Sequence, residues 1–90
     1  MTNKVLAILT IRTENLPDNF QEILIHEREV VAQWKHDGIL EQLYLRPTRN
    51  GAVLIFNGVT EEHARHLMTT LPLYSLALSV EILPLIASES

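Results

Sequence analysis

The chain of 90 residues contains no cysteine, which removes several kinds of chemistry at once. Disulfides, thiolate nucleophiles and zinc or iron sites built on cysteine are excluded. Glycine is scarce too, and Gly38, Gly51 and Gly58 stand well apart. Phosphate-cradling loops need clustered glycines, so no nucleotide-binding motif of that kind is present. We therefore expect neither redox chemistry by the protein itself nor a bound cofactor.

A cluster of basic residues is also missing. The net charge is −4, and binding to a nucleic-acid backbone needs grouped Lys and Arg, so we expect no nucleic-acid partner. No apolar run reaches the roughly 18 residues that cross a bilayer. Residues 1–3 lead into a predicted strand without the features of a signal peptide. These observations predict a cytoplasmic protein without a membrane partner.

The composition is that of a folded protein. Hydrophobic residues make up 47% of the chain and charged residues 20%, which predicts one domain covering residues 1–90. At this length, burial of apolar surface only just outweighs chain entropy, so a partner subunit would help.

The first half of the chain predicts a strand followed by a helix. In residues 4–12, KVLAILTIR, the odd-numbered and the even-numbered positions are both apolar up to Thr10. This pattern is typical of a strand covered on both faces. After a loop, Asp18 or Asn19 suits the N-cap of a helix running from residue 20 to about Asp37. Gly38 then suits the position just past the helix end.

A hairpin and a second helix follow. Residues 39–46 predict a strand stopped by Pro47, and Asn50-Gly51 is a strong hairpin signal before a strand over residues 52–57. Thr60 can cap a helix that Leu71-Pro72 ends.

The last predicted element is a strand over residues 74–83, with Leu76, Leu78, Val80 and Ile82 on one face. The order is βαββαβ, an α+β ferredoxin-like fold with two helices on one face of a four-stranded antiparallel sheet. The other face is apolar as well, since Val53 and Ile55 lie on one side of their strand and Ala52, Leu54 and Phe56 on the other. A second copy of the sheet would cover it, which predicts a homodimeric α/β barrel or a larger homo-oligomer.

Glu27 stands out in the first helix. At about 100° per residue, six apolar side chains share one face around it: Phe20, Ile23, Leu24, Val30, Val31 and Trp34. Burying a carboxylate there costs several kcal/mol unless it is paired or protonated. The raised pKa expected in such surroundings makes it a better base for carbon acids.

The segment over residues 60–85 carries a resemblance. Its helix ends in Leu71-Pro72-Leu73-Tyr74 before the final strand, and this resembles the C-terminal half of the muconolactone delta-isomerase family. The upstream matches are Glu27, Glu29, Gly38 and Tyr44. On its second strand the family reads Leu-Trp-Arg, whereas this chain reads Leu43-Tyr44-Leu45 with the arginine one position later, at Arg46. Either the register compensates, or the family's anion-binding arginine is absent.

The resemblance implies a cofactor-free isomerase that moves a proton next to the carbonyl of a small unsaturated lactone. Such a reaction needs a base, a donor or cation near the developing enolate, and exclusion of water. Glu27 is the candidate base. Tyr44 and Arg46 are two positions apart in a predicted strand, so their side chains point to the same side. Tyr44 is the candidate partner of the enolate, and Arg46 is the candidate partner of a substrate carboxylate.

Structural roles compete with each of these assignments. Glu27 could form an ion pair with Arg46 or Arg12, or reach solvent at an edge; Tyr44 could be an ordinary sheet aromatic and Arg46 a solvated strand-end residue. Two other functions stay open. One is a barrel that binds a small apolar ligand without catalysis, and the other is a cofactor-free monooxygenase-like protein whose pocket Trp34 and Tyr44 would line.

Metal binding is not expected. The i, i+3 spacing of His63 and His66 could hold a metal ion, but no third ligand has a reason in the sequence to join them.

Overall fold

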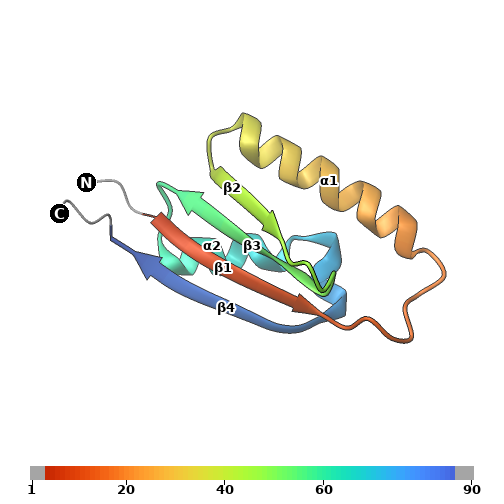
Figure 1. The fold of residues 1–90 in the computed structure, drawn as a ribbon. Helices are drawn as coiled ribbons and strands as arrows, with labels where there is room; N and C mark the ends of the chain where they lie inside the picture. Colours follow the sequence, from red (N-terminus) through yellow and green to blue (C-terminus); the bar gives the residue numbers. More distant parts are fainter. Residues whose placement is uncertain (1–3, 87–90) are drawn as a thin grey trace.

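The computed structural model describes residues 4–86, and its elements follow the predicted order. They are β1 Lys4–Ile11, α1 Phe20–His36, β2 Leu40–Leu45, β3 Gly51–Asn57, α2 Glu61–Thr69, the 3₁₀ helix η1 Pro72–Leu76, and β4 Ala77–Leu85. The strands lie in the order β2-β3-β1-β4, all neighbours antiparallel (Figure 1). The α+β ferredoxin-like prediction is confirmed.

Both helices pack on the same face of the sheet. Along β1 the alternate residues Val5, Ala7, Leu9 and Ile11 are buried, and they share one core with residues of α1 and α2. Those helix residues are Val31, Trp34, Ala64 and Met68. The indole of Trp34 meets the ring of Phe56 on β3 edge to face, with centroids 5.5 Å apart.

The predicted helix ends are largely confirmed. Gly38 takes a φ of 76° just past α1, a conformation that costs glycine little. At the start of α2, the side chain of Thr60 accepts a hydrogen bond from the His63 N–H at 3.0 Å. Asn19 occupies the N-cap of α1, but its side chain makes no capping hydrogen bond.

The predicted last strand begins too early. Residues 74–76 belong to η1, because Pro72 fixes the φ of its first residue and the Tyr74 N–H bonds the carbonyl of Leu71. Strand alternation predicts that Leu78 shares a face with Leu76 and Ile82; those two are buried, but Leu78 is 68% exposed. The β1–β4 register shifts between Thr10 and Ile11, and this bulge leaves Leu78 opposite no β1 residue.

The β2–β3 hairpin forms as predicted, although β3 begins at Gly51 rather than at residue 52. Gly51 lies so close to β1 that a Cβ atom there would be 1.9 Å from the carbonyl oxygen of Leu9. Only glycine therefore allows the two strands to pair at this point.

We use the name open face for the side of the sheet that no helix of residues 4–86 covers. Strand alternation places Leu6, Ile8, Val53, Ile55 and Leu83 there. The first four are half-buried and Leu83 is exposed. The open face is therefore apolar at its centre, as the sequence predicts. Within the described residues, no helix is both long and apolar enough to span a bilayer.

Candidate active-site pocket

A pocket of about 790 Å³ lies between α1, the β2–β3 hairpin and η1. Its apolar lining consists of Leu9, Ile11, Phe20, Leu24, Val31, Ala32, Leu43, Leu45, Ala52 and Leu73. The α1 residues that line it extend from Phe20 to Lys35, so the pocket runs along most of the helix. A volume of this size falls in the range of small-molecule sites.

Glu27 lines this pocket, half-buried, and is held from η1. Its Oε1 accepts a hydrogen bond from the backbone N–H of Leu73, with 3.0 Å between the two atoms. Burial raises the pKa of the Glu27 carboxyl above its ordinary value, and the hydrogen bond from Leu73 opposes part of that rise. The structure thus places an acid of raised pKa at the wall of a largely apolar pocket.

Four basic residues surround the same pocket: Arg28, Lys35, Arg46 and Arg49. None of them forms an ion pair with Glu27; the one ion pair found within residues 4–86 is the exposed Lys4–Glu41 contact. The expected alternative of a structural pair between Glu27 and Arg46 or Arg12 is therefore not observed in this part of the chain.

Arg46 lies at the rim of the pocket. It lines the cavity, while its Nη1 donates a hydrogen bond to Thr10 Oγ1 at 3.0 Å. Thr10 belongs to the open face, because it pairs with Gly51 and Ser79 in the alternation of β1. Arg46 therefore reaches across the sheet at the end of β2.

Tyr44 is not part of the pocket. It pairs with Val53 on the open face and is 57% exposed. Its neighbours Leu43 and Leu45 point to the helix side and line the pocket instead. The structure thus brings Glu27 and Arg46 to one cavity and leaves Tyr44 on the other side of the sheet.

Several pocket residues were missed by the sequence reasoning. Gln21, Arg28, Ala32 and Lys35 all line the cavity from α1. They follow one another at spacings of seven, four and three residues, so they lie along one side of the helix beside the apolar face. That spacing could have been read from the sequence, but not the hairpin that faces this side.

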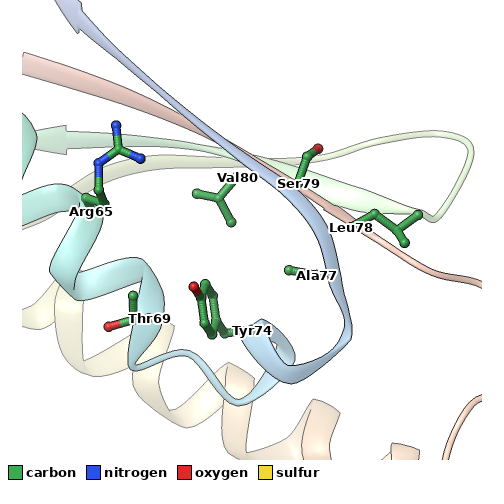
Figure 2. Close-up of a pocket in the computed structure, with 7 residues that line it drawn as sticks. All are labelled: Arg65, Thr69, Tyr74, Ala77, Leu78, Ser79 and Val80. Atoms are coloured by element: carbon green, nitrogen blue, oxygen red, sulfur yellow. The ribbon is translucent and has the colours of Figure 1, made fainter.

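A second hollow, of about 480 Å³, lies between α2, η1 and the start of β4 (Figure 2). Arg65 and Tyr74 are its ionisable residues. The Thr69 hydroxyl donates to the carbonyl of His66 in its own helix, and Ser79 belongs to the open face. The hollow thus offers few uncommitted polar groups. The hollow and the pocket border the same element, because Leu73 of η1 lines the pocket and Tyr74 of η1 lines the hollow.

Among residues 4–86 no group of three potential metal ligands comes together, and His63 and His66 are both exposed on α2.

Comparison with solved structures supports the fold. The whole chain superposes on 93% of muconolactone isomerase, with 17% identity and a TM-score of 0.75. An antibiotic biosynthesis monooxygenase matches 96% of this chain over 98% of its own, with 14% identity and a TM-score of 0.63. Another similar structure is that of 5-chloro-2-hydroxyhydroquinone dehydrochlorinase from Burkholderia phenoliruptrix in complex with 2,5-dihydroxybenzoquinone. It covers 96% of both chains, with 10% identity and a TM-score of 0.66.

No family sequence profile and no curated protein matches the chain. At these identities the likeness establishes the shared fold, and that fold carries different chemistries in the three neighbours.

Proposed function

We propose that the protein is a cofactor-free isomerase that moves a proton within a small unsaturated lactone or a related carbonyl compound, with Glu27 as the base. The observation that carries the proposal is the Glu27 carboxyl at the wall of a largely apolar cavity, with a raised pKa and one oxygen free of any partner in the described chain. A base of this kind suits abstraction of a proton next to a carbonyl.

The reaction has two proton transfers and no net redox change. Glu27 removes a proton from the carbon next to the carbonyl, and the electron pair moves into a dienolate. The neutral Glu27 carboxyl then returns the proton to the distal carbon, and the double bond shifts. Developing charge on the enolate oxygen is stabilised by nearby cations, of which Arg46 and Arg28 line the pocket.

The lining also indicates the kind of substrate. An apolar wall bordered by four basic side chains fits a small apolar molecule that carries a carboxylate, and Arg46 at the rim is the proposed partner of that group. Tyr44 has no part in this chemistry within one subunit, because it lies on the opposite face.

The open face gives the proposal its second component, a homodimer. Its apolar centre, formed by Leu6, Ile8, Val53 and Ile55, would be covered by the same face of a second copy. Tyr44 would then lie at the subunit contact. The pocket itself is formed by one chain.

A non-catalytic ligand-binding barrel is the second candidate. The observation in its favour is that the one hydrogen bond found for the Glu27 side chain within residues 4–86 goes to the backbone of η1, a contact that also serves the fold. The monooxygenase-like alternative has less support, because Trp34 is in the core and Tyr44 is on the open face, so neither lines the pocket.

The test is hydrogen exchange at the α-carbon of a butenolide carboxylate in D₂O, followed by proton NMR. Glu27→Gln should slow the exchange by at least about 100-fold, the usual contribution of a general base. Glu29→Gln, an exposed site on the same helix, is the matched control and should exchange at the wild-type rate. Exchange that survives in Glu27→Gln excludes Glu27 as the base. Binding of the butenolide to the wild-type protein without any exchange favours the non-catalytic candidate.

A further inference from the structure

We propose that the backbone N–H of Leu73 is a positioning group for the pocket: it fixes Oε1 of Glu27 and leaves Oε2 as the oxygen that meets the ligand. The inference rests on the proposed role of Glu27 but concerns a different group, on a different element. It begins from the hydrogen bond between the two residues, which are 46 positions apart in the chain.

The donor is free for this purpose because of where it stands in η1. The first N–H groups of a helix have no partner within the helix. Pro72, the first residue of η1, has no N–H at all, and the Tyr74 N–H is already bonded to the carbonyl of Leu71. The Leu73 N–H lies between these two and is satisfied by Glu27.

The contact is partly buried, which makes the geometry restrictive. An N–H shielded from water is costly to leave unpaired, so its bond to Oε1 resists rotation of the carboxyl group. Leu73 also lines the pocket, so the anchor stands at the cavity wall. The carboxyl is thereby oriented by the protein before any ligand arrives, which is the condition for efficient proton transfer.

No side chain of the described residues competes for Glu27. The charged groups that line the same pocket are Arg28 and Lys35 on α1, and Arg46 and Arg49 near the hairpin turn. None is within ion-pair distance of Glu27 in this part of the chain, and η1 carries no charged residue toward the pocket. The second oxygen of Glu27 is therefore uncommitted, while the first is engaged.

The same bond favours the reactive form of the acid. A hydrogen bond donated to the carboxylate stabilises the anion, and this opposes the rise in the pKa of Glu27 that burial causes. The Leu73 N–H thus favours the carboxylate form of Glu27 against the effect of burial.

The experiment replaces the Leu73 amide with an ester, which deletes the N–H and keeps the leucine side chain. The pKa of Glu27, read from the ¹³C shift of its carboxyl, should rise relative to wild type. The lower limb of the pH profile for butenolide exchange should move upward with it. The matched control is an ester at Tyr74, which removes the neighbouring η1 bond to Leu71 and should leave the pKa of Glu27 unchanged. An unchanged pKa in the Leu73 ester would overturn the proposal.

A second measurement needs no altered backbone. In the wild-type protein, the ¹H and ¹⁵N shifts of the Leu73 amide should titrate with the pKa of Glu27, and in Glu27→Gln that titration should vanish. A Leu73 amide that does not respond to Glu27 also refutes the proposal. A protein that shows both NMR effects but no butenolide exchange keeps the positioning role and loses the isomerase, so the two failures are distinguishable.

Discussion

Glu27 and Tyr44 lie on opposite sides of the sheet. Glu27 lines the pocket between α1 and the hairpin, whereas Tyr44 pairs with Val53 on the open face. The residues that share the side of Glu27 are Leu43 and Leu45, one position to either side of Tyr44. In the reaction that we propose, Tyr44 therefore cannot donate to the enolate within one subunit, and the basic residues at the pocket would stabilise that charge.

The stability of the protein should depend on the ionisation of Glu27. Its pKa is raised in the folded state above an ordinary value of 4.5. The folded state therefore binds the proton more tightly, so stability should fall as the pH rises from about 4.5 through the folded pKa, and the penalty should persist above it. Urea unfolding from pH 4 to pH 8 measures this slope. Glu27→Gln keeps an acceptor for Leu73 and should flatten it; an equal slope in both proteins would contradict the assignment.

The open face should govern self-association. Val53→Lys places a charge in the apolar centre of that face, and we expect sedimentation velocity to show a wild-type dimer and a monomeric variant. Ile25→Lys, at an exposed position of α1, is the control and should remain dimeric. A wild-type monomer at micromolar concentration would rule out the proposed pairing.

Gly51 should be the least replaceable of the three glycines. A Cβ atom at Gly51 would overlap the Leu9 carbonyl, so Gly51→Ala must push β1 and β3 apart. We expect a loss of more than about 3 kcal/mol, the scale of severe packing defects. At Gly58 a Cβ atom meets nothing within 4 Å, so Gly58→Ala should cost only the backbone penalty of its positive φ, about 1–2 kcal/mol. Urea unfolding of both variants provides the comparison, and equal losses would show that the close approach does not matter.

Arg46 should contribute to binding of anionic ligands. In Arg46→Gln, the Kd of a butenolide carboxylate measured by calorimetry should rise about tenfold, which corresponds to about 1.4 kcal/mol. Lys4→Gln removes a cation whose partner is Glu41, away from the pocket, and should leave the Kd unchanged. If both variants weaken binding equally, the effect is one of overall charge.

The Thr60 cap should stabilise α2. Thr60→Ala removes the acceptor of the His63 N–H and should cost about 1 kcal/mol in thermal or urea unfolding. Thr60→Ser keeps the hydroxyl and should recover most of that loss. If Thr60→Ala leaves the free energy of unfolding unchanged, water replaces the hydrogen bond of the cap at no cost.

Local signals in the sequence were enough to predict the order of elements. The apolar alternation of β1, the glycine after α1, the hairpin turn and the Thr60 cap each act over a few residues, and each is found in the structure. The error at residues 74–76 has a local cause that strand alternation alone does not detect. Leu76 fits the alternation of a strand, but Pro72 and the Tyr74–Leu71 hydrogen bond close a helical turn before β4 can begin.

The candidate site was less accessible to sequence reasoning. Helical periodicity correctly indicated that Glu27 turns toward the sheet. Strand alternation predicted that Tyr44 and Arg46 point to the same side, but only Arg46 lines the pocket. The alternation of side chains along β2 does not say which of its two faces lies toward the helices. The orientation of β2 depends on its pairing with β3. The Leu73 partner of Glu27 lies 46 residues away and is a backbone group, so no side-chain pattern could identify it.

The sheet separates two equilibria. The pocket that we assign to a ligand is on the helix side, and the surface that we assign to a second copy is on the other, with the Arg46–Thr10 contact reaching between them at one end. The free energies of ligand binding and of dimer formation should accordingly be nearly additive. A saturating ligand should therefore leave the dimer dissociation constant almost unchanged. In such an architecture, quaternary structure can diverge during evolution while the chemistry inside each subunit is inherited intact.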